Sequence, residues 1–203
     1  MIRPPGFRGA AFSEASDGDL RAGDRSGVAR RLGISPEWAT VRQVHGRSVV
    51  LAGAPGELSA ADALVTEEVG LPVAVFTADC MGIVIEADRA LAVVHAGWRG
   101  VVAGAIDEAV DYLVERGHTP IRAAIGPAIG PCCYEVGPEV ASEFASGSKT
   151  TWGTTSVDLP TAAALRLKDI EIWVDGRCTR CEPGFFSHRR DGDVRRLAAI
   201  GWL

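Results

Sequence analysis

Three side chains that could hold a metal ion together follow apolar runs in the sequence. His45 lies in Gln-Val-His-Gly, Cys80 closes Thr-Ala-Asp-Cys, and His95 ends an apolar run that precedes Ala-Gly-Trp-Arg-Gly. Strand ends are where α/β proteins commonly place their chemistry, so these side chains could converge. Two imidazoles and a thiolate form a zinc ligand set that leaves the fourth position open. The same residues also fit a small buried cysteine and a turn histidine, so both interpretations stay open at this stage.

The other four cysteines show no clear ligand pattern. Cys178 and Cys181 form a single CxxC pair, and a structural zinc needs a second pair. Cys132 and Cys133 are adjacent, and adjacent residues seldom ligate one ion. The sequence therefore predicts no second zinc and favours a packing role for this adjacent pair in a tight loop. A thiol of low pKa beside the site stays open as an alternative, which makes Cys133 a candidate contact to substrate.

Arginines and carboxylates near these positions could bind an anionic or polar substrate. Arg99 lies in the first turn of an expected helix, where free N–H groups favour negative charge. Arg189 and Arg190 form a pair whose guanidinium groups suit phosphate, although such a pair is also typical of solvated surface. Asp62 could support a metal ligand or contact substrate, and either Asp62 or Asp79 could serve as an acid–base group, since the sequence does not choose between them.

The composition excludes several classes of protein. The 203 residues are 47% hydrophobic and 23% charged, as in globular proteins with a full core. No apolar run approaches the ~20 residues that span a bilayer, and the first residues lack the apolar stretch of a secretory signal. A net charge of −5 without a basic block argues against a nucleic-acid partner. Five cysteines argue against a disulfide framework. We therefore expect a cytoplasmic protein without membrane or nucleic-acid partners.

Helices and strands interleave along the chain. Apolar runs predict strands over residues 41–44, 48–52, 73–77, 82–86, 91–95, 121–125, 170–174 and 196–202. Helical periodicity and stop residues predict helices over residues 25–32, 100–116, 139–145 and 160–168. No linker or internal repeat divides the chain, so the sequence predicts a single α/β domain over residues 1–203 with a mixed sheet.

The order of the motifs resembles the YfiH-like family, also called laccase-domain or polyphenol oxidase proteins. The similar segments are RQVHG, ADALVT, TADC, VVHAGWRG, IGPAIGPCCYEVG and CT…FFSHRRD, over about residues 38–203. The resemblance implies one α/β domain with layered mixed sheets and flanking helices, similar to the catalytic domain of the cytotoxic necrotising factor toxins. It also implies that His45, Cys80 and His95 bind zinc. The implied reactions are phosphorolysis of adenosine, inosine and methylthioadenosine, with phosphate as co-substrate, and deamination of adenosine.

The N-terminal region departs from the family pattern. Relatives usually carry Ser-Thr-Arg-x-Gly-Gly and then Ser-Leu-Asn-Leu-Gly, whereas residues 1–36 are shortened and hold Phe-Ser-Glu-Ala-Ser and Asp-Leu-Arg-Ala-Gly. The arginine that usually follows Ser-Thr is absent. If that arginine binds substrate in relatives, affinity or specificity differs here. Near the C-terminus, Arg195 and Arg196 keep an arginine where relatives carry Thr-Gly-Arg.

Three other functions stay open beside the zinc-dependent nucleoside enzyme. An older family label is copper-dependent polyphenol oxidase. A full laccase is excluded because a blue-copper centre would leave only His118 and His188 for a trinuclear cluster, but a single copper on the same ligands stays open. A cysteine hydrolase or deamidase would use Cys80 as nucleophile with a histidine base. The third open function is a protein that binds a metal ion without catalysis.

We expect the zinc-binding nucleoside enzyme. The candidate catalytic residues are Cys80, His45, His95, Arg99 and Asp79, and the candidate substrate contacts are Asp62, Arg189, Arg190 and Cys133. The sequence makes no prediction of the oligomeric state.

Overall fold

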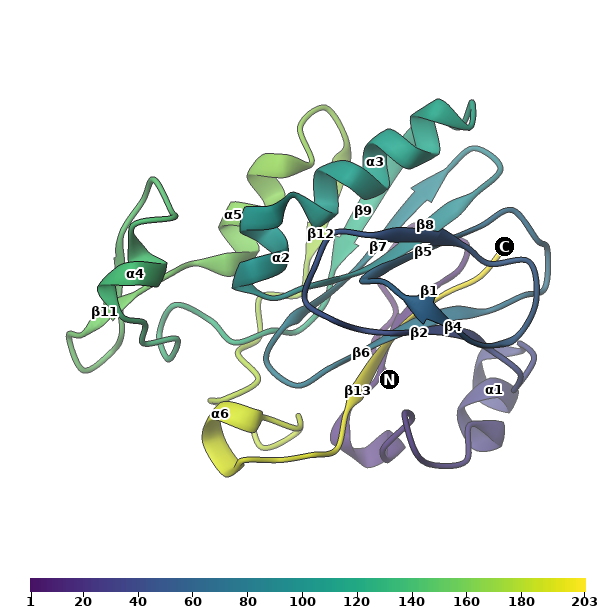
Figure 1. Cartoon of the computed structure of the whole chain (residues 1–203). Coiled ribbons are helices and arrows are strands. Elements are labelled where there is room, and N and C mark those ends of the chain that lie inside the picture. Colours follow the sequence, from purple (N-terminus) through teal and green to yellow (C-terminus); the bar gives the residue numbers. More distant parts are fainter.

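Two mixed β-sheets lie face to face in the computed structural model, which describes residues 1–203 (Figure 1). The five-stranded sheet has the order β1 (Ala10–Phe12), β13 (Leu197–Gly201), β6 (Val73–Thr77), β2 (Ala39–Arg42) and β4 (Gly56–Ala60). The six-stranded sheet has the order β12 (Glu171–Val174), β9 (Pro120–Ile125), β7 (Met81–Ala87), β8 (Leu91–Ala96), β5 (Ala63–Thr66) and β3 (Val49–Leu51). Apolar side chains such as Val75, Val84 and Val93 fill the space between the sheets.

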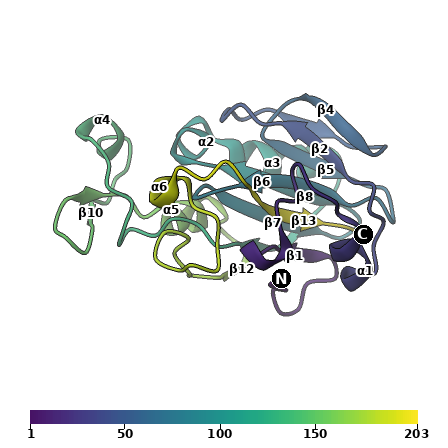
Figure 2. The same ribbon diagram turned by 90° about the horizontal axis from the view of Figure 1, so that it is seen from below.

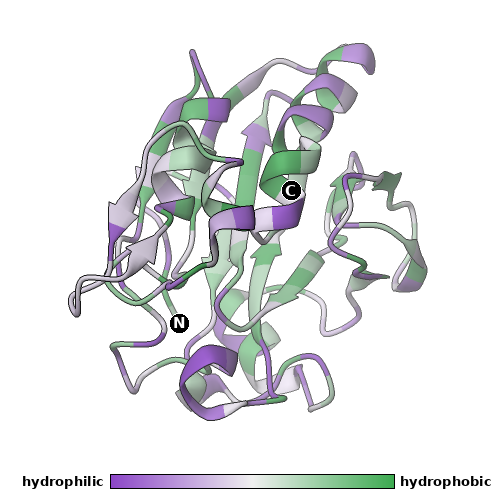
Figure 3. Cartoon of the chain, turned by 60° about the vertical axis from the view of Figure 1, so that its left-hand side comes forward, coloured by the Kyte–Doolittle hydropathy of each residue, from purple (hydrophilic) through white to green (hydrophobic).

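Helices cover the outer faces of both sheets. Helices α2 (Trp98–Ala103), α3 (Ala105–Glu115) and α5 (Leu159–Arg166) pack on the six-stranded sheet, and α1 (Ser26–Leu32) packs on the five-stranded sheet (Figure 1). The strands are mostly hydrophobic, whereas the helices alternate between hydrophilic and hydrophobic residues (Figure 3). Because side chains alternate across a strand, the central strands need apolar residues for both faces. This explains the continuous apolar runs in β6, β7 and β8.

The structure confirms a single α/β domain with mixed sheets and corrects several elements. The helix expected over residues 100–116 is two helices, α2 and α3, because Gly104 adopts a left-handed conformation with φ +86° between them. Strands β1, β4, β5, β10 (Ser148–Lys149) and β11 (Thr155–Ser156) are additional to the predicted strands. The predicted strands 73–77, 82–86 and 91–95 agree with β6, β7 and β8 within one residue at each end.

A small extension projects from one end of the sheets (Figure 2). It contains the short helix α4 (Pro138–Ala141) and the two-stranded sheet of β10 and β11. The helix expected over residues 139–145 is therefore only one turn long. No helix in the structure is both long and apolar enough to cross a membrane.

The chain crosses from one sheet to the other in the short loop between β6 and β7. Cys80 lies in this loop, and His95 lies in β8 opposite Gly82 of β7. His45 follows β2, which pairs with β6 through Ala39 and Val73. The ends of β2, β6 and β8 thus carry the three predicted metal ligands to one edge of the sheet pair.

Candidate functional site

His45, Cys80 and His95 come together at this edge, and we call them the His/Cys cluster. Their ligand atoms all lie within 4.8 Å of one another. The two imidazole rings meet edge to face, with centroids 4.7 Å apart. His95 is buried, Cys80 is half-buried and His45 is exposed. The cluster is therefore closed on one side and accessible to a ligand on the other.

Asp62 holds the cluster from behind and is completely buried. Its Oδ1 lies 2.8 Å from Nδ1 of His95, which leaves Nε2 as the ring nitrogen free for another partner. The backbone N–H groups of His45 and Gly46 donate to the same carboxylate at 2.9 and 2.6 Å. These bonds support His45 in a left-handed conformation with φ +61°, which is unusual for a residue with a Cβ.

His95 forms hydrogen bonds with both Asp62 and Cys80, so the pKa values of these three groups depend on one another. Burial alone would raise the pKa of Asp62, but hydrogen bonds from His95 and the Gly46 backbone lower it. Burial would also raise the pKa of Cys80, but hydrogen bonds from His45 and His95 lower it to about 6. Burial would lower the pKa of His95, but Asp62 and Cys80 raise it to about 9. Near pH 7 the metal-free cluster is therefore a thiolate beside an imidazolium.

Gly97 leaves room for the Cys80 sulfur. A Cβ at this position would lie 2.8 Å from Sγ of Cys80 and 3.5 Å from the His45 ring. The first of these distances is shorter than van der Waals contact, so a side chain would displace the thiol. Packing against the Cys80 thiol thus explains why Gly97 follows His-Ala in the sequence.

A cavity of about 400 Å³ opens in front of the cluster. This volume falls in the range of small-molecule sites, roughly 300–1,000 Å³. His45, Cys80 and His95 all line it, together with Asp79 and Arg189 from the predicted set. The lining residues to which the sequence analysis gave no role in the site include Arg21, Arg42, Gln43, Glu57, Phe76, Tyr134, His188 and Arg196.

Four arginines and two carboxylates, Glu57 and Asp79, line the cavity, so positive charge is in excess there. Arg21, Arg42 and the segment that holds both Arg189 and Arg196 are three separate parts of the chain, so the sequence does not show these arginines as one group. The side chains of Arg21 and Arg42 form no hydrogen bond or ion pair within the protein, so their donors are available to a ligand. Arg21 belongs to the shortened N-terminal region, which thus still contributes an arginine to the cavity.

Four of the additional lining residues, Arg42, Gln43, Tyr134 and His188, lie inside recognised motifs. Gln43 of RQVHG donates to the Phe76 carbonyl and accepts from the Phe76 N–H, both at 2.8 Å, so its amide joins the end of β2 to β6. Tyr134 of CCYEVG faces the cavity, and burial together with the nearby Cys80 charge raises its pKa to about 12. The available signal was their place in these motifs, where Gln43 lies two residues before His45 and Tyr134 directly follows Cys133.

Three predicted site residues lie outside the cavity: the candidate catalytic residue Arg99 and the candidate substrate contacts Arg190 and Asp62. Arg99 is exposed on α2, with its guanidinium 4.5 Å above the Trp98 ring, and it does not line the cavity. Arg190 donates to the backbone carbonyls of Thr179, Arg180, Glu182 and Phe185, so its donors serve the fold. Asp62 lies behind the cluster rather than in the cavity.

Asp79 and Arg189 are placed together at the cavity wall. Asp79 has a left-handed backbone with φ +84°. Its carboxylate accepts hydrogen bonds from Oγ1 of Thr179 at 2.7 Å and from the backbone N–H of Arg189 at 2.6 Å. Arg189 is the second residue of α6 (His188–Asp191), and its guanidinium lies 5.1 Å from the Tyr134 ring centroid. Asp79 therefore fixes α6 against the cavity.

The remaining cysteines form a group of their own. Cys133 does not line the cavity, because its thiol faces Cys181 at 3.1 Å. The ligand atoms of Cys132, Cys133, Cys178 and Cys181 all lie within 4.8 Å of one another. The adjacent pair, for which the sequence favours a packing role, thus lies against the CxxC pair.

Comparisons with known proteins agree with the motif order. Residues 16–203 match the family model described as multi-copper polyphenol oxidoreductase laccase. A purine nucleoside phosphorylase of Streptomyces griseus is 38% identical over 89% of this chain and 80% of its own length. A purine nucleoside phosphorylase of Deinococcus radiodurans is 37% identical over 96% of this chain and 82% of its own.

Solved structures show the same fold. YlmD from Geobacillus stearothermophilus superposes with a TM-score of 0.79 at 33% identity, over 88% of this chain and 78% of that one. YfiH from Bacillus licheniformis gives a TM-score of 0.78 at 29% identity, over 88% of this chain and 79% of that one. With its motifs, its fold and its relatives in agreement, the chain belongs to the YfiH-like family of laccase-domain proteins.

Proposed function

We propose that this chain is a purine nucleoside phosphorylase that binds a nucleoside and phosphate in front of a zinc ion. The observation that carries the proposal is the His/Cys cluster at the wall of a cavity that four arginines line. Curated relatives that cover most of this chain bear the name purine nucleoside phosphorylase. Phosphorolysis needs an anion site and a nucleoside site side by side, which a basic cavity of this size provides.

The donor set fits a zinc ion. His45, Cys80 and His95 supply two nitrogens and one sulfur, and Asp62 contacts the second nitrogen of His95. Metal-binding histidines commonly have such a carboxylate partner, which fixes the ring and raises its basicity. Zinc with three protein ligands supplies an open position that polarises a substrate oxygen or acidifies a bound water. The same ligands suit copper, so metal selectivity is part of the proposal's test.

The cavity arginines hold the phosphate in this proposal. A phosphate dianion that attacks C1′ of the ribose must be neutralised and oriented, and guanidinium groups do both. Arg42 and Arg21 have free donors, and Arg189 is fixed in place through Asp79. Each lost bond to a charged partner costs about 1.5–3 kcal/mol, which corresponds to roughly a ten- to hundredfold loss of rate. Arg99 lies outside the cavity and takes no part.

The departing purine requires a proton. His188 lines the cavity with an exposed side chain and is the proposed donor. Asp79 is a positioning residue in this scheme, because both of its oxygens accept hydrogen bonds that hold the Thr179 and Arg189 segments. Asp62 is likewise a positioning residue, because it is buried behind His95. Deamination of adenosine would use the same cavity with water in place of phosphate.

A cysteine hydrolase is the second candidate function. Cys80, His95 and Asp62 have the order of a nucleophile, a base and a group that orients the base. The lowered pKa of the thiol also suits a nucleophile. A thiol nucleophile must be free of metal to act, so the two functions predict opposite effects of zinc.

The test is a panel of nucleosides with and without phosphate, in which the mass of each released base is measured. Zinc-loaded protein should cleave purine nucleosides only when phosphate is present. Cys80→Ser should abolish cleavage, whereas His118→Gln should not, because His118 contacts Glu67 outside the cavity. The hydrolase would be supported instead if zinc-loaded protein cleaved no nucleoside of the panel and zinc-free protein cleaved amides or esters.

A further inference from the structure

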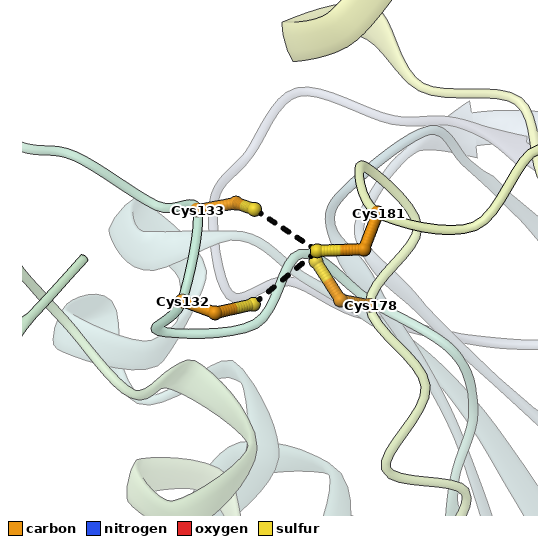
Figure 4. Close-up of side chains that lie close together, drawn as sticks. All are labelled: Cys132, Cys133, Cys178 and Cys181. Carbon is orange, nitrogen blue, oxygen red and sulfur yellow. Dashed lines mark hydrogen bonds between the residues drawn. The ribbon is translucent and has the colours of Figure 1, made fainter. Parts of the chain in front are cut away.

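Four thiols with no assigned role lie within one small volume on the far side of the cavity wall. We call Cys132, Cys133, Cys178 and Cys181 the cysteine cluster (Figure 4). Sγ of Cys181 lies 3.1 Å from Sγ of Cys133 and 3.6 Å from Sγ of Cys132. None of the four is in a disulfide.

The parallel pairing of β9 with β12 brings the two cysteine pairs together. Cys132 and Cys133 follow β9, while Cys178 and Cys181 follow β12. A further parallel bridge between Ala128 and Cys178 continues the pairing beyond both strands. Two loops that are far apart in sequence therefore leave the sheet side by side.

Both local conformations direct the sulfurs inward. The N–H groups of Cys133 and Tyr134 donate to the Gly130 carbonyl at 3.0 Å, and this tight turn presents both adjacent thiols to the same side (Figure 4). The Cys178 carbonyl accepts from the N–H of Cys181 at 3.1 Å, which closes a second tight turn. A CxxC turn opposite another cysteine pair is the ligand arrangement of structural zinc sites.

The sulfur separations fit a tetrahedral metal centre. Zinc–sulfur bonds of ~2.3 Å place the sulfurs of a tetrahedron about 3.8 Å apart. The Cys181–Cys133 and Cys181–Cys132 separations of 3.1 and 3.6 Å lie below this value, and all six separations are at most 4.8 Å. A cation at the centre thus requires only shifts of a fraction of an ångström to about one ångström.

The surroundings suit a thiolate site. The Gly130 N–H donates to Sγ of Cys178 at 3.2 Å, and such bonds to sulfur typically accompany metal thiolates. A Cβ on Gly130 would lie 3.3 Å from the Cys132 sulfur, so the glycine permits this approach. Arg180 directly precedes Cys181 in the sequence, and its Nε is buried without a hydrogen-bond partner. Four thiolates around a divalent cation carry a net charge of −2, which a nearby guanidinium offsets.

We propose that the cysteine cluster is a second metal site, which binds one zinc ion in addition to the ion at the His/Cys cluster. Its role is structural, because four protein ligands leave no open position for a substrate. The ion joins the loop after β9 to the loop after β12. Both loops contribute to the cavity wall, through Tyr134 on one side and through the Thr179–Asp79 bond on the other.

The experiment measures the zinc content of the full-length chain by mass spectrometry of the metal. Wild-type protein should contain about two zinc ions per chain, and Cys178→Ser/Cys181→Ser should contain about one. The matched variant His45→Ala/His95→Ala should also contain about one, because it removes only the other site. A wild-type content of about one ion that disappears in the histidine variant would overturn the proposal.

A second measurement covers the case in which the serine variant does not fold. The histidine variant, loaded with Co²⁺, should show intense thiolate-to-cobalt charge-transfer absorption and the d–d bands of tetrahedral coordination. Absence of these bands would refute the second site. Thiol titration of chelator-treated, denatured wild-type protein should find all five cysteines free. Only three or one free thiols would show that the cluster forms disulfides instead. Neither readout depends on catalytic activity, so failure here is distinct from failure of the proposed function.

Discussion

Replacing Asp62 with asparagine should weaken zinc binding at the His/Cys cluster without removing a ligand. The carboxylate faces His95 Nδ1 at 2.8 Å and accepts from the His45 and Gly46 N–H groups. An amide has one acceptor oxygen, so it cannot satisfy donors that approach both carboxylate oxygens. Loss of such a partner typically costs 10- to 100-fold in metal affinity, or about 1.4–2.7 kcal/mol.

The loss should depend on pH in a defined direction. Wild-type His95, with a pKa of about 9, must release a proton before it binds zinc at pH 7. The Asp62→Asn substitution removes the carboxylate that raises this pKa, so the pKa of His95 should fall and protons should compete less with zinc. Part of the affinity loss is therefore hidden at pH 7, and the full loss should be measured at pH 9.

The assay is competition for zinc with a chromogenic chelator at both pH values. Asp175→Asn is the matched control, because Asp175 is also a buried carboxylate but pairs with Arg177 away from the cluster. Circular dichroism shows whether each variant is folded. A folded Asp62→Asn protein whose zinc affinity stays within about twofold of wild type at pH 9 would refute the positioning role.

Three further predictions concern the cavity and its cluster. Gly97→Ala should lower zinc affinity because its Cβ would lie 2.8 Å from Sγ of Cys80. Gly100→Ala is the control and should not lower it, because the nearest atom to its Cβ would lie at 3.5 Å. Equal zinc affinities of the two variants in a titration would contradict the packing argument. In metal-free protein, the alkylation rate of Cys80 should fall as the pH drops through about 6, since the thiolate is the reactive form. Bound zinc should block this alkylation. A midpoint near the ordinary thiol pKa of ~8.5 would contradict the thiolate–imidazolium pair. Arg42→Ala should raise KM for phosphate roughly tenfold or more, and Arg99→Ala should change it little; the reverse order in steady-state kinetics would return the phosphate site to α2.

Local patterns predicted the parts of the fold that depend on local chemistry. The buried runs of β6, β7 and β8 need apolar residues on both faces, so the sequence shows them directly. Strand β4 was missed because its residues Gly56–Ala60 are mostly exposed and lack that pattern. The break at Gly104 was missed because the apolar stripe continues across it into α3.

The residues of the candidate site were also predicted only in part. His45, Cys80 and His95 were predicted because rare side chains at strand ends stand out in the sequence. For Asp62 the sequence left open whether it supports a metal ligand or contacts substrate, because its contact to His95 spans 33 residues. Arg21 was missed because it is an exposed residue outside every motif, and Arg42 because an exposed arginine, even at the start of RQVHG, shows no role until the fold places it at the cavity. The cysteine cluster was missed for the same reason, since only the parallel pairing of β9 and β12 joins its halves.

Phosphorus NMR of zinc-loaded protein with inosine and phosphate tests the central claim most directly. The proposed phosphorylase predicts a ribose 1-phosphate signal that grows in proportion to released hypoxanthine and that Cys80→Ser abolishes. Hypoxanthine release without ribose 1-phosphate, or no base release from inosine, adenosine or methylthioadenosine, would contradict the assignment.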